Sequence, residues 1–187
     1  MSPSRRKWAV RSVVVASIGA GTLFLFRLTS LSEAHAPPAK PAAAQENPGH
    51  ELKELEVQLQ KKPGHLPVLM RMAQIEHDQG KLEEAAAHLR DAVSSEPGNA
   101  DAHLELGRVL YEKGDRDEAL KETEQALTIN PKNVDALYNL GAISANSGNT
   151  ERAVSYWESA VATAPGSESG EKARDGLSRL RSGGTRR

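Results

Sequence analysis

From about residue 50 onward, hydrophobic residues recur with the spacing of one helix face. Apolar or small side chains follow one another at intervals of three and four positions, which places them on one side of an α-helix. Three stripes of this kind are Leu69, Met72 and Ala73; His103, Leu106, Gly107 and Leu110; and Leu137, Leu140 and Gly141. Shorter stripes flank them: Leu52, Leu55 and Leu59, and Ala173, Leu177 and Leu180. The pattern predicts a series of amphipathic helices.

These helices belong to a unit that recurs along the chain with a period of thirty-four. Small, turn-forming or helix-ending residues return at this interval in five registers. They are Gly80, Gly114 and Gly148; Pro97, Pro131 and Pro165; Ala85, Ala119 and Ala153; Ala92, Ala126 and Ala160; and Ala73, Gly107 and Gly141. A fixed period of this length indicates repeats that stack on their neighbours and share one continuous core.

Each register suits one position in a helix-turn-helix unit. The glycines are predicted to end the first helix in the left-handed conformation, and the prolines to end the second helix. Asn99 and Asn133 are predicted N-caps of the helices that follow. Asp115, with Glu118 three residues later, predicts a capping box at the start of a second helix. The alanines and Gly107 and Gly141 are expected where the two helices of one hairpin approach closely.

These residues resemble the tetratricopeptide repeat family, whose unit has small residues at its eighth, twentieth and twenty-seventh positions and a proline at its thirty-second. The resemblance covers residues 66–97, 100–131 and 134–165. Two residues depart from the family pattern: His103 stands where tryptophan is common, and Thr123 where a large apolar residue is usual. The resemblance implies an all-α fold, a right-handed α-solenoid of antiparallel helix pairs, without catalytic activity of its own.

The same register divides the chain. We expect a repeat domain over residues 50–181, in which a cap helix over 50–62 precedes the three repeats and a second cap helix over 168–181 follows them. Pro63 lies one full period before Pro97, so the first cap corresponds to the second helix of a missing unit. Residues 182–187 are expected to form a disordered tail.

The N-terminal region predicts a location. Residues 12–26 are apolar and uncharged, Arg11 and Arg27 flank them, and more cations precede them, as in an export signal or a membrane anchor. Over residues 1–36 we keep both readings, cleavage after Ala36 or retention of 8–26 as an anchor. Residues 37–49, rich in proline and alanine, read as an extended linker. The domain is then expected outside the cytoplasm, on the periplasmic side of the inner membrane.

Composition excludes several kinds of chemistry. Residues 50–165 carry 20 acidic and 12 basic side chains, so the body should repel the phosphates of a nucleic acid. The chain has no cysteine, and the zinc-protease-like run from His50 to Glu54 has glutamate in place of the second histidine. We expect no catalytic residue, no cofactor, no metal site and no small-molecule substrate.

Beside the core stripe, each first helix carries a second stripe, which the family resemblance places on a concave groove. The predicted groove residues are Met70, Arg71, Gln74, His77, Leu104, Arg108, Tyr111, Tyr138, Asn139 and Ala142. Their mixture of apolar and polar groups suits an amphipathic helix or an extended peptide. The carboxylate clamp of some family members is not expected, since Met70, Gln74, Glu105 and Asp135 stand at its positions. The competing interpretation is that Met70, Leu104 and Tyr138 only pack between repeats.

The sequence therefore predicts a non-catalytic scaffold that binds a peptide or helix of a partner protein, with the membrane contacted through the N-terminal segment. Two alternatives stay open. The chain could be a self-assembling structural subunit, that is, a homo-oligomer, or an accessory component of a membrane complex such as the one for cytochrome c maturation.

Overall fold

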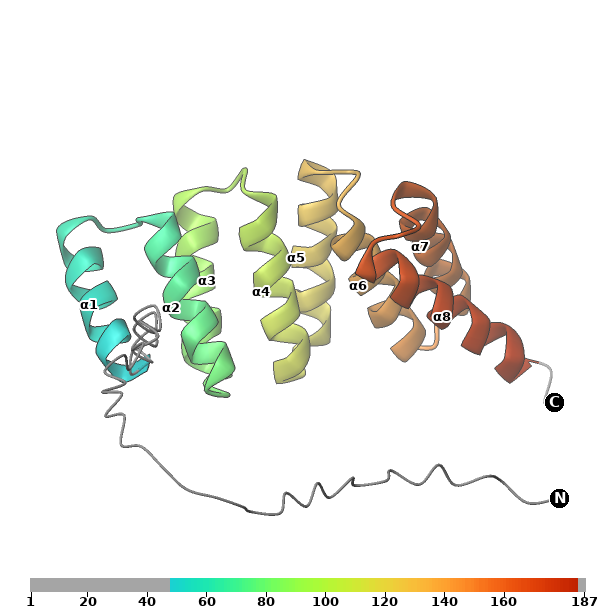
Figure 1. Cartoon of the computed structure of the whole chain (residues 1–187), viewed down its shortest axis with the longest axis horizontal. Helices are drawn as coiled ribbons and strands as arrows, with labels where there is room; N and C mark the ends of the chain where they lie inside the picture. The colour runs from blue at the N-terminus through green and yellow to red at the C-terminus, as the bar shows by residue number, and fades with distance from the viewer. Residues whose placement is uncertain (1–47, 185–187) are drawn as a thin grey trace, which may run out of the picture. The chain divides into compact units, whose positions relative to one another are not determined.

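The structure, a computed structural model, describes residues 48–184, which form eight α-helices joined by short turns (Figure 1). The helices are α1 (Pro48–Lys61), α2 (Leu66–Asp78), α3 (Leu82–Ser95), α4 (Ala100–Lys113), α5 (Arg116–Ile129), α6 (Val134–Asn146), α7 (Thr150–Thr163) and α8 (Glu168–Gly184). All regular structure in this part of the chain is helical, and the predicted α-solenoid is confirmed.

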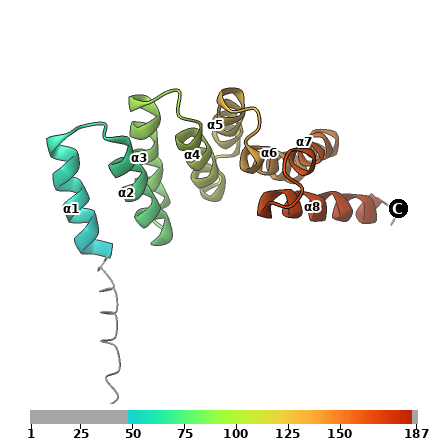
Figure 2. The ribbon, with the colours of Figure 1, turned by 45° about the horizontal axis from the view of Figure 1, so that its top comes forward.

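The helices pack as successive hairpins: α2 with α3, α4 with α5, and α6 with α7 (Figures 1 and 2). The first helices of successive units lie beside one another, since α4 contacts α6 and α6 contacts α8. This layer of first helices carries the residues predicted to line the groove.

The turns inside the hairpins form at the predicted glycines. Gly80, Gly114 and Gly148 have φ values of 73°, 99° and 79°, in the left-handed region that side chains with a Cβ avoid. The second helices α3, α5 and α7 end two residues before Pro97, Pro131 and Pro165. The residue before each proline is extended, with φ between −126° and −148°, as the proline ring requires.

All three predicted N-cap residues stand at helix starts, and two of them form the side-chain cap bond. The side-chain oxygens of Asn99 and Asn133 each accept the backbone N–H three residues later at 2.9 Å. The predicted capping box is wrong, because Asp115 caps no backbone N–H in the structure. Its carboxylate lies 2.9 Å from the Lys113 ammonium, and Glu118 pairs with Arg90 on α3. The ion pairs draw both acids away from the helix end.

The two residues that depart from the family pattern are buried and hydrogen-bonded. The His103 ring nitrogens lie 2.7 Å from the Glu122 carboxylate and 3.1 Å from the Pro97 carbonyl oxygen. The Thr123 hydroxyl donates to the carbonyl of Ala119 at 2.7 Å. Neither polar group is left without a partner, so the core accepts them without an unpaired buried atom.

The terminal helices keep the repeat register. α1 begins one full period before α3 and packs Leu52, Leu55 and Leu59 on α2. α8 begins one full period after α6 and buries Ala173 and Leu177. It continues to Gly184, past the predicted end at 181, and the Ser182 hydroxyl donates to the carbonyl of Arg179 in this added turn. With no proline or turn to stop it, the helix runs on.

The predicted export segment and residues 37–47 of the predicted linker lie outside the described residues. Within 48–184, no helix combines the length and apolar character needed to cross a membrane.

Candidate functional site: an open groove between α4 and α6

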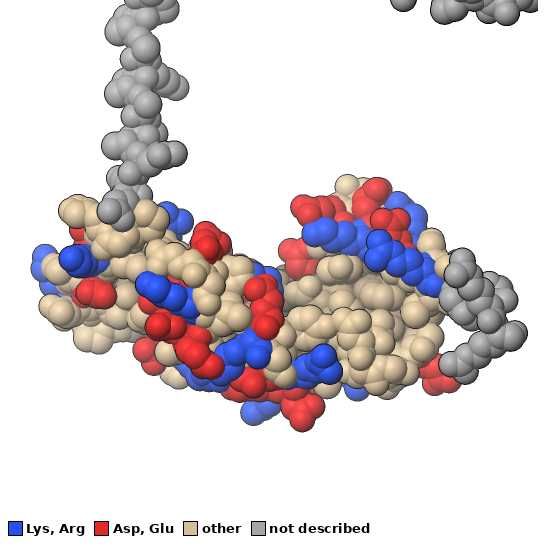
Figure 3. All heavy atoms as spheres, turned by 90° about the horizontal axis from the view of Figure 1, so that it is seen from below, with Lys and Arg blue, Asp and Glu red and all other residues tan. Residues whose placement is uncertain are grey.

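A cavity of about 170 Å³ opens on the layer of first helices, between α4 and α6. Its lining residues are Gly107, Arg108, Tyr111, Glu112, Thr123, Tyr138, Asn139, Ala142 and Ile143. Figure 3 shows a hollow on this side of the molecule, in which most of the surface is uncharged and the charged groups gather at the rim. The site is an apolar depression with polar edges.

The cavity exists because two facing positions hold small residues. Thr123 on α5 faces Gly107 on α4, and a Cβ on that glycine would overlap with the Thr123 hydroxyl. One repeat earlier, Leu89 stands at the position of Thr123. One repeat later Trp157 does, with its indole ring against Gly141. The equivalent space is therefore filled in the third repeat and open in the second.

Five predicted groove residues line this cavity: Arg108, Tyr111, Tyr138, Asn139 and Ala142. A smaller depression of about 30 Å³ lies between α2 and α4, and there Met70, Gln74 and Arg108 stand with Glu105, Ala73, Leu89 and Val109. Arg108 borders both depressions. Seven of the ten predicted groove residues therefore line these two neighbouring depressions over α2, α4 and α6.

The other three predicted residues have different surroundings. Leu104 is only 7% exposed and packs with Ala126 and Ala136, so its place in the open groove was wrong. Its face of α4 is covered because α5 and α6 converge on it. Arg71 forms a two-pronged ion pair with Glu51 at 2.6 and 3.0 Å, which ties α2 to α1. This hydrogen-bonded guanidinium holds the pKa of the Glu51 carboxyl below its ordinary value.

The charged groups at the cavity edge form a network across two repeats. The Arg108 guanidinium donates to Glu105 at 2.9 Å and to Glu112 at 3.1 Å. His77 on α2, the third of the predicted residues that lie outside both depressions, also belongs to this network. Its Nε2 atom is 2.7 Å from the Glu112 carboxylate and 2.8 Å from the Arg108 guanidinium. His77 therefore closes a contact between α2 and α4 and does not enter the cavity.

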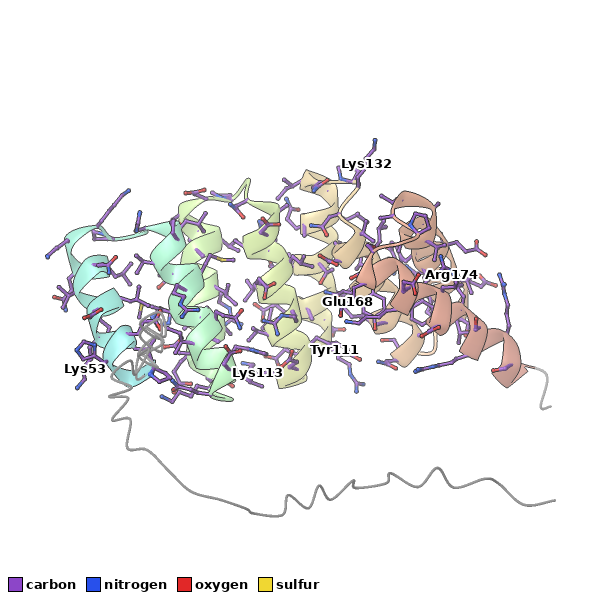
Figure 4. The ribbon with its side chains drawn as sticks, in the orientation of Figure 1. Lys53, Tyr111, Lys113, Lys132, Glu168 and Arg174 are labelled. Carbon is purple, nitrogen blue, oxygen red and sulfur yellow. The ribbon has the colours of Figure 1, made fainter. Side chains whose placement is uncertain are left out.

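The two tyrosines hold the walls. Tyr111 projects from α4, and the side-chain amide of Asn146 on α6 donates to its hydroxyl (Figure 4). Tyr138 lies on α6, and the Lys172 ammonium is 6.0 Å from its ring centroid, within cation–π range. The pKa of Lys172 is raised, first by its hydrogen bond to Glu168 and then by nearby charges. Tyr111 is thus held by a residue of α6, and Tyr138 by a residue of α8.

Sequence reasoning missed four lining residues: Gly107, Glu112, Thr123 and Ile143. A signal for two of them was present, since Thr123 stands one period before Trp157, and Gly107 is the residue that faces Thr123 as Gly141 faces Trp157. Lys172 lies near Tyr138 because α8 packs on α6, a contact between helices that the local sequence pattern does not reveal. Among residues 48–184 no group of three histidine, aspartate or glutamate side chains is placed to hold a metal ion.

The fold and the site define a class: a helical-repeat protein with an open groove on one layer of helices. The family model described as tetratricopeptide repeat matches residues 70–133 and 107–168, together more than half of the chain. The chain belongs to the tetratricopeptide repeat family, whose members are in general non-catalytic scaffolds that bind proteins or peptides. No curated protein matches the chain.

Solved structures share the fold at low sequence identity. The crystal structure of MamA has a TM-score of 0.60 and 18% identity, over 73% of this chain and 92% of that one. YrrB, described as a tetratricopeptide repeat protein with an unusual peptide-binding site, has a TM-score of 0.61 and 21% identity, over 68% and 66%. A tetratricopeptide repeat protein from Parabacteroides merdae has a TM-score of 0.63 and 22% identity, over 72% and 55%.

Proposed function

We propose that this protein is a non-catalytic scaffold that holds a peptide or helix of a partner protein in the groove over α2, α4 and α6. One observation carries the proposal: the cavity between α4 and α6 is open, and the tyrosines 111 and 138 stand on its walls with a floor of small residues. Aromatic walls around an unfilled apolar space suit a partner's side chain, which removes apolar surface from water on binding.

Two further points support a peptide partner. The cavity and the smaller depression beside α2 lie along the stack, with Arg108 between them, so an elongated segment can contact both. The peptide-binding site described for YrrB, which has a similar fold, supports the same use of this family's architecture in this chain. An elongated segment lying across several repeats is a common mode of peptide recognition on helical surfaces.

We further propose that the domain works outside the cytoplasm, on the periplasmic side of the inner membrane. The cations at positions 5–7, the apolar run 12–26 and the small residues Ala34 and Ala36 support export. Either cleavage after Ala36 releases the domain or residues 8–26 anchor it. The role as an accessory component of a membrane complex, such as one for cytochrome c maturation, stays a more specific prediction within this proposal.

A pull-down from cells tests the groove. The double variant Tyr138→Ala, Arg108→Ala should lose partners that the wild-type chain recovers, because it removes an aromatic wall and the centre of the edge network. The matched control is Tyr156→Ala, Arg152→Ala, which removes a second tyrosine and arginine pair, stacked at 5.7 Å on α7 outside both depressions. Equal recovery by both double variants would remove the groove from the proposal.

Localisation has its own test. Protease added to intact spheroplasts should digest the repeat domain, and mass spectrometry of the recovered chain should find an N-terminus after Ala36 or an intact segment 8–26. A full-length chain that resists protease until the cells are lysed would contradict export.

A further inference from the structure

Building on the proposed function, we propose that the cavity on Gly107 and Thr123 accepts one aromatic side chain from a basic segment of the partner. The aromatic residue is the anchor, and the basic flanks match the charge around the groove. The proposal therefore specifies which side chains the partner segment carries, whereas the proposed function specifies only a peptide or helix.

The size of the cavity fits one ring. A closed apolar cavity of about 150 Å³ accommodates benzene, and this cavity, open at its mouth, measures about 170 Å³. The walls are Tyr111 and Tyr138, and Ala142 and Ile143 add aliphatic surface between them. An aromatic guest can pack edge-to-face or offset against these rings, arrangements that aliphatic side chains cannot form.

The chain itself shows how such a space is filled. In the third repeat the Trp157 indole lies on Gly141, and its N–H donates to the Tyr138 carbonyl at 3.1 Å. Thr123 and Gly107 stand at the same two positions one repeat earlier, where the chain supplies no ring. The partner's aromatic side chain occupies in the second repeat the place that Trp157 occupies in the third.

One polar side chain at the cavity can hydrogen-bond the backbone of the partner peptide. The Asn139 amide lines the cavity, and within residues 48–184 it has no hydrogen-bond partner. An amide offers a donor and an acceptor together, which matches the N–H and C=O of a peptide beside its anchor residue. Asn139 therefore orients the segment while the cavity holds the ring.

The charge around the groove favours a basic partner. Both cations near the cavity are already engaged: Arg108 with Glu105 and Glu112, and Lys172 with Glu168 at 2.6 Å. Three carboxylates, those of Glu105, Glu112 and Glu168, stand against these two cations, and residues 48–184 carry 23 acidic against 16 basic side chains. The summed field attracts lysine and arginine and repels an acidic segment.

The experiment is a selection of random short peptides, displayed on phage, against the full chain. The selected peptides should carry an aromatic residue with lysine or arginine nearby. Replacing that aromatic residue by alanine in a synthetic peptide should weaken binding roughly tenfold to a hundredfold, the value of one buried ring. Raising the salt concentration should weaken binding further, since the flanking charges are exposed.

The decisive variant is Thr123→Leu, which puts a side chain into the cavity as Leu89 does one repeat earlier. It should weaken the selected peptides about tenfold or more while the circular dichroism and melting curve stay those of a folded chain. The control Thr163→Leu makes the same change at an exposed position on α7 and should leave binding unchanged.

The outcomes separate the two proposals. If Thr123→Leu binds the selected peptides as the wild type does, or if these peptides lack aromatic or basic residues, the anchor proposal is wrong. Loss of binding in Tyr138→Ala, Arg108→Ala would then still support the groove. If no peptide is selected at all, or binding survives that double variant, the proposed function fails together with the anchor.

Discussion

Trp157 lies between two glycines that come from different helices. A Cβ on Gly141 of α6 would overlap with the five-membered ring of the indole, and a Cβ on Gly176 of α8 would come within 2.8 Å of the six-membered ring. The indole cannot move away from one glycine without approaching the other. The two glycines are therefore fixed by a close approach of helices, and not by their turn-forming property.

Gly141→Ala should for this reason destabilise the chain by about 1 to 3 kcal/mol, the usual cost of overpacking a filled core. The melting temperature should fall by roughly 2 to 4 °C for each kcal/mol. Gly98→Ala is the matched control, since an added Cβ there meets nothing within 4 Å and its φ is not positive. A calorimetric scan in which both variants melt alike would contradict the packing of Trp157.

At the scale of single helices, the caps differ although the sequence suggests they are equivalent. α4 and α6 begin with an asparagine that accepts a backbone N–H, whereas the Asp115 carboxylate at the start of α5 pairs with Lys113. The cap bond satisfies a donor that the helix leaves open, and the exposed ion pair contributes little.

Asn133→Ala should therefore cost about 1 kcal/mol of stability, and Asp115→Ala clearly less, since only the first removes a cap bond. Urea denaturation of the two variants side by side measures the difference. An equal or larger loss for Asp115→Ala would mean that its carboxylate caps α5 in solution.

The α4–α5 hairpin contains a buried polar pair in place of a large apolar contact. His103 and Glu122 have side chains 8% and 15% exposed, and the second His103 nitrogen meets the Pro97 carbonyl, so the pair fixes the start of α4 against α5. Removing one partner leaves the other without its hydrogen bond, which costs more than replacing both by apolar groups.

We expect His103→Leu to destabilise the chain by about 1 to 3 kcal/mol, because Glu122 then loses its partner in a largely buried place. The double variant His103→Leu, Glu122→Leu should recover part of this loss. Equilibrium unfolding of the wild type, both single variants and the double variant gives the coupling between the two residues. If the double variant loses as much unfolding free energy as the two single variants lose together, the proposed pairing is contradicted.

The repeat made the helices and turns predictable because each recurring residue has one local task. A glycine such as Gly114 or a cap such as Asn99 depends only on its own few neighbours in the sequence. The cavity could not be predicted in this way, because it depends on a ring that is missing at Thr123. Only the comparison with Trp157, one repeat later, reveals that missing ring. Leu104 was misplaced because α5 and α6 together cover it.

At the scale of the whole described stack, the last helix, α8, has a polar outer face. On α6 the residues that receive α7 include Leu137, Leu140 and Gly141, and the residues one period later on α8 are Glu171, Arg174 and Asp175. All three are exposed. A further helix could not pack on them without burying charges, so α8 is a polar cap at this end of the described stack.

Restoring the apolar pattern at this end should restore the tendency to continue the stack. The triple variant Glu171→Leu, Arg174→Leu, Asp175→Gly gives α8 the residues of α6 at these positions and exposes an apolar patch, which proteins tend to cover by association. The test is sedimentation of residues 43–187, which leave out the predicted export segment. The wild type should have the mass of a single chain at every concentration, and the mass of the variant should grow with concentration. Three neutral replacements on the same face, Glu171→Gln, Arg174→Gln and Asp175→Asn, remove the charges without adding apolar surface and should leave the mass unchanged. A wild-type chain whose mass also grows with concentration would contradict this prediction.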